Sequence, residues 1–495
     1  MSRLRMLVLT ISLVGLCAVG FAQEKKRMTE AEKVDFALTN AQSLKFPRGE
    51  RLPLFFWHLR ATKSDDEQEI EATLKALDTR GLPVVTVWTT AAKAKPAAME
   101  RAVRIARAQN KLGLVATAFA GNTGNGFYAD KATWHVDEKG EPFADTSHGK
   151  SQLGCPFEKG GWPTVEGQLR EWVKAYKDGG ARLDGVWFDW ENTGPAEWND
   201  AWEMSRKCVK CQKALDPKGL KDFATFQKAM REIRSAMQKI FVDVIHESFP
   251  KANVANYGVY PQGPYRYWWD YYEKLPAGAP FQADQRARYR PWVNEFPLTG
   301  FTIGMPVVYG WGGIFSDYDY ADTDYRWFYN MLLVFSDSAQ HRPAGVPLVP
   351  FVNRWVKLPD TSPDAVPLSE EKYKELLWHI FLRGADGLYI WCADADIARE
   401  LIPVHSVYAA ALEYREFLTN GKPITFDVPA KQGPVVSGLK LGNKLLVRRT
   451  DFGPEPLKDV TISVEGGTFT VTPLASGRTV VLSGPSSMKR EPVSQ

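Results

Sequence analysis

The chain is poor in cysteine. Only 5 Cys occur among 495 residues, and Cys17 lies in an apolar N-terminal stretch. The other four, Cys155, Cys208, Cys211 and Cys392, can form one or two disulfides in an oxidising compartment. Cys208 and Cys211 are spaced like half of a zinc site, but no second CxxC pair or HxxxH motif supplies two more ligands. We therefore predict a structural role for the cysteines, with no bound metal and no cofactor.

An excess of charge of one sign is also lacking. The formal net charge is +4, and loss of Arg3 and Arg5 with the N-terminal stretch leaves +2. This balance is too close to zero to predict a nucleic-acid partner, although a polyanion can still bind locally.

Long apolar runs are absent apart from residues 7–22, LVLTISLVGLCAVGFA. This run is shorter than the roughly 20 residues of a membrane span. It follows two arginines and ends in the small residues Gly20 and Ala22, which is typical of a signal peptide, residues 1–22, cleaved after Ala22. We expect a secreted or periplasmic protein with no membrane span.

Between residues 51 and 420, short apolar runs alternate with amphipathic helical patterns. Eight strands are predicted, at 52–59, 82–90, 112–120, 184–190, 252–258, 302–310, 346–352 and 387–392. Eight strand–helix repeats with continuously apolar strands are typical of a (β/α)₈ TIM-type barrel, an α/β fold. An open, doubly wound sheet is disfavoured because no glycine-rich phosphate loop follows the first strand. Residues 23–50 lead into this catalytic barrel.

The pattern changes at Gly421. Residues 421–485 contain period-two runs separated by turns and show no helical pattern, which predicts a small, antiparallel, all-β C-terminal domain. Residues 486–495 are expected to form a disordered tail.

Long segments follow four of the predicted strands, at 121–162, 192–218, 259–301 and 311–321. In a (β/α)₈ barrel the site lies at the carboxyl ends of the strands, so these segments are expected to wall a substrate cleft. The third segment is dense in aromatic rings, which favours either stacking on sugars or a small core beneath the loop. These rings belong to Tyr260, Tyr265, Tyr267, Trp268, Trp269, Tyr271 and Tyr272.

Two acids end the fourth predicted strand, in the sequence DGVWFDWEN. Asp189 and Glu191 are two residues apart, so their side chains leave the same face of the strand at a spacing of about 7 Å. Acidic residues at the carboxyl end of a barrel strand usually take part in catalysis. Asp184, at the other end of the strand, is predicted to be a capping or surface acid.

The mechanism depends on where a second reactive group lies. A conventional retaining glycosidase needs a nucleophilic carboxylate about 5–5.5 Å from its acid, and the sixth to eighth predicted strands contain none, although Asp394 and Asp396 follow the last. The alternative is substrate assistance, in which the acetamido group of an N-acetylhexosamine attacks its own anomeric carbon. Glu191 then protonates the leaving oxygen and Asp189 stabilises the acetamido nitrogen.

These residues resemble the hyaluronidase family of glycoside hydrolases. FDWEN is similar to the D-W-E or D-F-E motif on strand four of that family, and ANYGVYP, MPVVYG, VPLVPFVNRW and GADGLYIWCADAD resemble its later strands. The resemblance implies that Glu191 is the acid, that Asp189 positions the acetamido group, and that Tyr257, Tyr309 and Trp391 contact the reacting sugar. The chain departs from the family after the acids, so the mechanism is expected to carry over better than the substrate.

We predict a glycoside hydrolase that cleaves a polysaccharide or glycan at an N-acetylhexosamine. Trp57, at the end of the first strand, and Asn192, after the acids, complete the predicted substrate contacts. Arg286, Arg288 and Arg290 suit an anionic polymer, or are solvated surface charges. Two alternatives stay open: a glycosidase for non-acetylated polymers that uses another carboxylate, and a sugar-binding barrel without catalysis.

Overall fold

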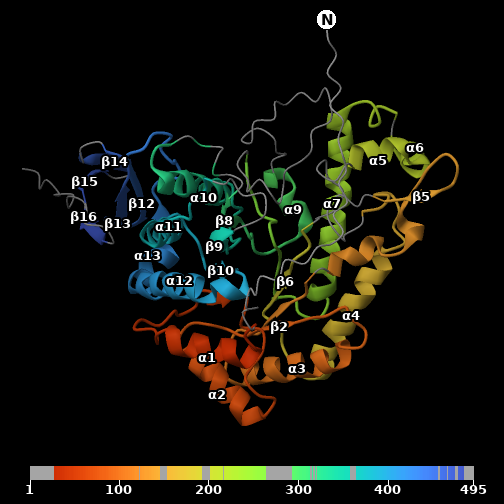
Figure 1. The fold of residues 1–495 in the computed structure, drawn as a ribbon, viewed down its shortest axis with the longest axis horizontal. Helices are drawn as coiled ribbons and strands as arrows, with labels where there is room; N and C mark the ends of the chain where they lie inside the picture. Colours follow the sequence, from red (N-terminus) through yellow and green to blue (C-terminus); the bar gives the residue numbers. More distant parts are fainter. Residues whose placement is uncertain are drawn as a thin grey trace, which may run out of the picture.

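The structure of the chain is a computed structural model. It describes residues 27–121, 123–144, 153–191, 201–215, 217–263, 292–312, 315, 318, 320–356, 364–454, 458–464, 467–473 and 478–483. Most of these residues form parallel strands surrounded by helices, and the C-terminal strands lie to one side of them (Figure 1).

The parallel strands form two four-stranded sheets. The first has the order β1 (Leu54–Phe56), β10 (Leu388–Ile390), β9 (Phe351–Val356) and β8 (Val307–Trp311). The second has the order β2 (Val85–Val87), β3 (Thr117–Phe119), β6 (Gly185–Phe188) and β7 (Asn253–Asn256). Each of the eight predicted apolar runs overlaps one of these strands, although β8 and β9 extend beyond their runs to Trp311 and Val356. The prediction of an α/β fold with parallel strands is confirmed.

Backbone hydrogen bonds link the two sheets at both of their edges. Beside β1 and β2, the N–H of Val85 donates to the carbonyl oxygen of Leu59 at 2.9 Å. Beside β7 and β8, the N–H of Thr302 donates to the carbonyl oxygen of Val254 at 3.0 Å. The eight strands therefore lie side by side in the order in which they occur in the chain. Backbone pairing is weak at two places, between β1 and β2 and between β7 and β8.

Helices follow the strands and cover them. They are α2 (Glu67–Asp78), α3 (Lys95–Lys111), α4 (Trp162–Asp178), α7 (Phe223–His246), α10 (Thr323–Gln340), α11 (Glu370–Leu382) and α12 (Ile397–Ala411). Helix α2 shows why they form, because Asp66 caps its first N–H groups while Ile70, Leu74 and Leu77 lie buried on one face. Within the described residues, no helix is long and apolar enough to cross a membrane.

Shorter elements occupy the connections. They are α1 (Glu30–Asn40), α5 (Ala201–Lys207), α6 (Val209–Ala214), α9 (Phe296–Thr299), α13 (Arg415–Asn420), β4 (His135–Val136) and β5 (Pro142–Phe143). Helix α1 lies inside the segment that the sequence marks only as a lead-in. It begins with a capping box, in which the Thr29 side chain accepts from the Glu32 N–H and the Glu32 carboxylate accepts from the Thr29 N–H.

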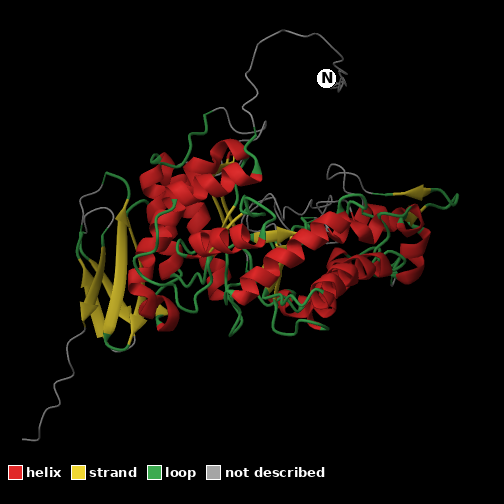
Figure 2. Ribbon diagram, turned by 90° about the horizontal axis from the view of Figure 1, so that it is seen from below, coloured by secondary structure: helices red, strands yellow, loops and turns green. Residues whose placement is uncertain are grey.

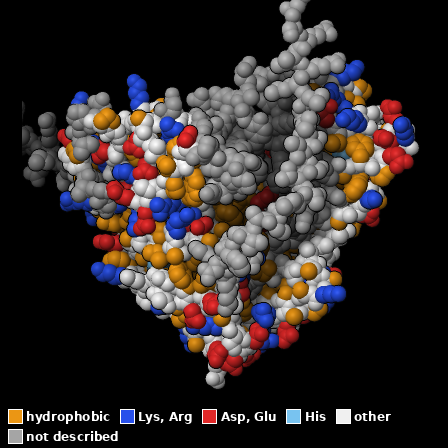
Figure 3. Space-filling model, in the orientation of Figure 1, with side chains coloured by type: hydrophobic (Ala, Val, Ile, Leu, Met, Phe, Trp, Pro, Cys, Tyr) orange, Lys and Arg blue, Asp and Glu red, His pale blue; other side chains and the backbone are white. Residues whose placement is uncertain are grey.

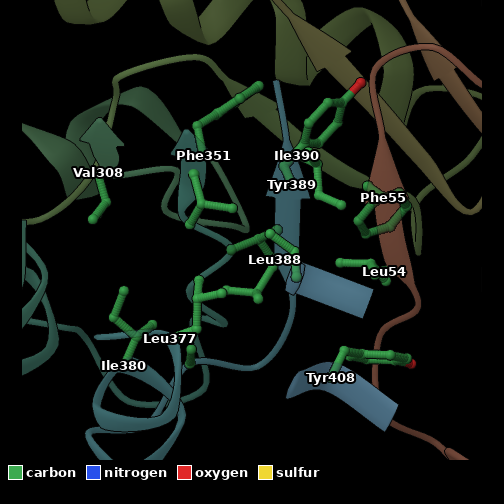
Figure 4. Close-up of a cluster of buried hydrophobic side chains, with 14 of the residues drawn as sticks. Leu54, Phe55, Val308, Phe351, Leu377, Ile380, Leu388, Tyr389, Ile390 and Tyr408 are labelled. Carbon is green, nitrogen blue, oxygen red and sulfur yellow. The ribbon is translucent and has the colours of Figure 1, made fainter. Parts of the chain in front are cut away.

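Strand β6 shows how the core is divided. Trp187 packs inward, with its ring centroid 4.7 Å from that of Phe55 and 5.8 Å from that of Tyr389. Phe188 points the opposite way and stacks on Phe241 of α7 at 4.3 Å. This alternation creates one core between the strands and another beneath the helices. Figure 4 shows a part of the hydrophobic core in which side chains of β1 and β10 meet those of α11 and α12.

The C-terminal residues form antiparallel strands. One sheet has the order β11 (Lys422–Pro423), β12 (Pro434–Leu441), β13 (Lys444–Asp451) and β16 (Thr479–Ser483), and a hairpin joins β14 (Val460–Val464) to β15 (Gly467–Val471). Figure 2 shows these strands packed beside the helices.

A buried polar network attaches this sheet to helix α11. Arg448 of β13 donates to both carboxylate oxygens of Glu375 at 2.7 Å, and both side chains are almost fully buried. His379 hydrogen-bonds to Ser437 at 2.7 Å and to Thr450 at 3.0 Å. Burial lowers the pKa of His379, as do two nearby arginines, so its ring is neutral in the interface. Removal of one member would leave charge or polarity buried without a partner.

We predict that Glu375→Ala lowers the free energy of unfolding by about 3–5 kcal/mol, because Arg448 then stays buried without its counter-ion. Glu371→Ala, on the same helix but with an exposed carboxylate 3.6 Å from Lys372, is the control and should change stability by less than about 1 kcal/mol. Urea unfolding followed by circular dichroism measures both. Equal losses in the two variants would contradict the role of the network.

Candidate active site

The two predicted catalytic acids lie just beyond the end of β6. Asp189 is half-buried and Glu191 is exposed. The N–H of Asp189 donates to the carbonyl oxygen of Gly121 at 3.0 Å, which continues the pairing between β3 and β6. Asp189 therefore keeps the alternation of the strand and shares the inward face of Trp187.

Trp190, between the two acids, anchors this segment. Its ring is 1 % exposed and lies 5.1 Å from Phe127 and 5.7 Å from Phe241 of α7. A Cβ atom at Gly124 would lie 2.2 Å from the same ring, so only glycine fits there. Because Trp190 is held on the helix side, its neighbours are directed away from the helices.

Asn256, the last residue of β7, holds the backbone between the acids. Its Oδ1 accepts from the Trp190 N–H at 2.9 Å, and its Nδ2 donates to the Trp190 carbonyl oxygen at 3.1 Å. Asn256 is fully buried. Asn256 was not predicted from the sequence. An asparagine in an apolar strand indicates a buried polar group with hydrogen-bond partners, but the sequence does not show which residue is the partner.

The carboxyl group of Asp189 is unusual in its protonation. Burial, followed by the negative charge of Glu191, raises the pKa of Asp189 to about 8, and Arg60 opposes this shift. Part of the residue reaches the surface, but its carboxyl group is surrounded by protein, and it is the burial of this group that acts on the pKa. At neutral pH Asp189 therefore retains a proton.

Arg60 is the cation that faces Asp189, and sequence reasoning missed it. Its guanidinium lies 3.9 Å from the ring centroid of Trp57 and 5.2 Å from that of Phe119, and its Nε donates to the Trp57 carbonyl oxygen at 2.7 Å. Burial lowers the pKa of Arg60, whereas Tyr389 and Asp189 raise it. Its Nη2 is buried and has no hydrogen-bond partner among the described residues. A lone arginine just after the first strand was the only signal in the sequence.

The structure brings the predicted aromatic residues together. Tyr309 of β8 lies 6.3 Å from Tyr257 and stacks on Trp391 at 5.4 Å. The N–H of Tyr257 donates to the carbonyl oxygen of Phe188, the residue before Asp189. These three rings therefore form a row that begins beside the acids. Trp57 lies outside this row, with its ring 6.4 Å from that of Tyr389 and 4.7 Å from that of Phe119.

Some predicted residues lie outside the described part of the chain. These are Asn192, the arginines at 286, 288 and 290, and the aromatic residues of the segment after β7 other than Tyr260. Tyr260 itself is buried, in the hydrophobic core that also contains Trp190. Figure 3 shows the molecule in the orientation of Figure 1, and on the described part of this surface basic and acidic side chains are interspersed.

The other acids have partners. Asp394 lies 3.5 Å from His58 and 3.9 Å from Lys33 of α1, and Asp396 lies 3.2 Å from Arg399. Asp184 accepts from the Ala116 N–H and pairs with Arg182, which is the capping role predicted for it. Among the described residues, no contact brings Asp394, Asp396 or Asp184 beside Asp189.

The fold brings two further candidate ligands to the Cys208 and Cys211 pair. The sequence indicates that nothing completes the Cys208 and Cys211 pair, yet Cys155 and His135 lie beside it, and the ligand atoms of all four lie within 4.8 Å of one another. The fold joins segments whose spacing in the sequence follows no known zinc motif. Cys155, Cys208, Cys211 and Cys392 are all free thiols.

No protein-family model matches the chain. No curated protein matches it either.

Several solved structures are distantly similar. α-L-Fucosidase isoenzyme 2 from Paenibacillus thiaminolyticus is 12% identical over 76% of this chain and 51% of its own, with a TM-score of 0.44. The GH36 α-galactosidase AgaA from Geobacillus stearothermophilus is 11% identical over 92% and 58%, with a TM-score of 0.44. Bee venom hyaluronidase is 16% identical over 54% and 79%, with a TM-score of 0.31. This chain thus spans between half and three fifths of the length of the first two. All three names are those of glycosidases, hyaluronidase being one of several.

We predict that the contribution of Asp189 to the free energy of unfolding falls as the pH rises between about 4 and about 8, because folded Asp189 binds a proton up to about pH 8 whereas an unfolded aspartate loses it near 3.8. The stabilisation is complete below the unfolded value and is lost as pH passes the folded value. Asp189→Asn should flatten this slope, and Asp184→Asn should keep it. Urea unfolding across this range tests the point, and an unchanged slope in Asp189→Asn would refute it.

We predict that Asn256→Ala lowers the free energy of unfolding by about 1–3 kcal/mol or more, because the Trp190 N–H and carbonyl group then lose their partners in a buried place. Asn253→Ala, at the start of the same strand and only half-buried, is the matched control and should cost less. Thermal unfolding of both proteins is the measurement. A smaller effect at Asn256 than at Asn253 would show that the clamp on Trp190 contributes little.

Proposed function

We propose that this chain is a secreted glycoside hydrolase whose two parallel sheets form one (β/α)₈ barrel. The observation that carries the proposal is the acid pair beyond β6, in which the pKa of Asp189 is raised by burial and by the charge of Glu191. A pair of carboxyl groups with separated affinities for the proton is what acid-catalysed cleavage of a glycosidic bond requires.

The proton of the pair moves in the proposed reaction. Asp189 holds it in the free enzyme, and when substrate binds the proton moves to Glu191 through a water molecule that bridges the two side chains, which are roughly 7 Å apart. Glu191 then donates it to the leaving oxygen as the glycosidic bond breaks. Asp189 is left as a carboxylate beside the positive charge that develops on the sugar, and this charge offsets the cost of ionising a buried group.

The nucleophile that we propose is the acetamido group of the substrate. Asp394 and Asp396 pair with His58, Lys33 and Arg399 rather than with the acids. The acetamido oxygen attacks the anomeric carbon, and the Asp189 carboxylate accepts from the acetamido N–H. Tyr257, Tyr309 and Trp391 enclose the acetamido methyl group and the sugar ring in this arrangement.

The substrate that follows is a polysaccharide or glycan with an N-acetylhexosamine at the cleaved position, as the resemblance to hyaluronidases implies. Arg60, with one buried nitrogen that has no partner among the described residues, is suited to an oxygen of the bound sugar or to an anionic substituent. The signal peptide expected at residues 1–22 agrees with an extracellular polymer as substrate.

The deciding experiment follows the first product by proton NMR on hyaluronan, chondroitin, a chitin-type polymer and a plain β-glucan. We predict cleavage only of the acetamido polymers, retention of anomeric configuration, and inhibition by a thiazoline that resembles the cyclic intermediate.

Glu191→Gln should reduce turnover by a factor of about 10² or more while substrate binding persists, since the amide cannot donate the proton.

Asp184→Asn is the control for that variant and should remain active, because Asp184 lies at the other end of β6. Inversion, or rapid cleavage of the plain glucan, would reject substrate assistance in favour of a water-activating carboxylate. Binding of the polymers without any release of reducing ends would identify a sugar-binding protein instead.

A further inference from the structure

Four metal-binding side chains meet in a cluster that is separate from the acids. His135 lies on β4 and Cys155 lies before α4, so both belong to the segment between β3 and α4. Cys208 and Cys211 lie before and within α6, in the segment between β6 and α7. Their ligand atoms all lie within 4.8 Å of one another. The cluster thus joins the two segments that flank the strand of the acid pair.

The distances suit a shared metal ion. Cys155 Sγ lies 3.5 Å from Cys211 Sγ, and Cys211 Sγ lies 3.7 Å from His135 Nδ1. A tetrahedral zinc ion with Zn–S bonds of about 2.3 Å and a Zn–N bond of about 2.0 Å separates its ligand atoms by roughly 3.5–3.8 Å. A disulfide would require about 2.05 Å between the sulfurs, and none is formed.

The cluster is buried, and neighbouring backbone groups and an aromatic ring hold its side chains in place. The three cysteines are fully buried and His135 is 2 % exposed. The backbone N–H groups of Phe157 and Val136 hydrogen-bond to the sulfurs of Cys155 and Cys208, which is a common way to orient thiolate ligands. The ring of Phe143 stacks on His135 with the centroids 5.1 Å apart.

The local core is too small to hold these segments alone. The buried residues around the cysteines are Trp202, Leu215, Phe226 and Met230. They form a cluster distinct from the two large cores of the chain. Small units of this kind commonly need a metal or a disulfide for stability.

We propose that His135, Cys155, Cys208 and Cys211 bind one structural zinc ion. Three thiolates and one imidazole form a complete tetrahedral ligand set with no position left for substrate, so the ion stabilises the fold and takes no part in the reaction. Zinc is preferred because sulfur and imidazole ligands in this geometry select it over magnesium or calcium. Its effect is to hold the segment that follows Glu191 against the segment that follows β3.

The test begins with the unaltered chain, purified without chelator and analysed for metal by mass spectrometry. We expect about one zinc ion per chain, released together with reactive thiols when the protein is denatured. Cys208→Ala and His135→Ala should lose the metal. Cys392→Ala is the matched control, because Cys392 is equally buried but lies after β10, and it should keep the zinc.

A second measurement covers the case in which the variants do not fold. The unaltered chain, reduced and freed of metal, is titrated with Co²⁺, and the visible absorption of tetrahedral cobalt with thiolate ligands should appear at one equivalent. A disulfide among Cys155, Cys208 and Cys211 in the native protein, detected by mass, would overturn the proposal. So would the absence of both zinc and the cobalt spectrum, or unchanged metal content in Cys208→Ala.

Discussion

The position of the Asp189 carboxyl group, enclosed by protein and close to the charge of Glu191, is the constraint on which the rest of the site depends. Burying a carboxyl group beside another acid favours its protonated form, and this raises the pKa of Asp189 to about 8. The arrangement persists because the backbone on both sides is held firmly. Trp190 is packed against α7, and Asn256 pairs with both polar groups of the Trp190 backbone.

Arg60 opposes this rise in the pKa of Asp189. The Arg60 guanidinium lies against the rings of Trp57 and Phe119, which pack edge to face with their centroids 4.7 Å apart. A guanidinium that aromatic rings already hold in place loses little conformational entropy on binding a ligand, because folding has already ordered it. The row of Tyr257, Tyr309 and Trp391 adds an apolar wall, and such a combination of rings with few polar groups is common in sugar-binding sites.

Two further features keep this region in shape from a distance. The network of Glu375, Arg448 and His379 ties the C-terminal sheet to α11. The cluster of His135 and three cysteines joins the segments on either side of β6. Both consist of polar groups in buried places, where each member is stable only while its partners are present.

The sequence by itself determined the parallel strands, the antiparallel pattern after Gly421, and the pair Asp189 and Glu191 on one face of a strand. These depend on periodicity and on neighbours in the chain, which sequence reasoning can follow. The proposed roles of Glu191 and of the aromatic residues also come from the sequence, and the structure adds that Tyr257, Tyr309 and Trp391 lie in one row.

Which distant residues meet depends on the packed fold. Arg60 beside Asp189, Asn256 beneath Trp190, and Cys155 with His135 beside Cys208 are pairs separated by tens of residues or more. Local patterns carry no information about such meetings, because they are set by how the strands order themselves and how the helices cover them. The raised pKa of Asp189 belongs to the same class, since burial is a property of the packed molecule and not of the residue.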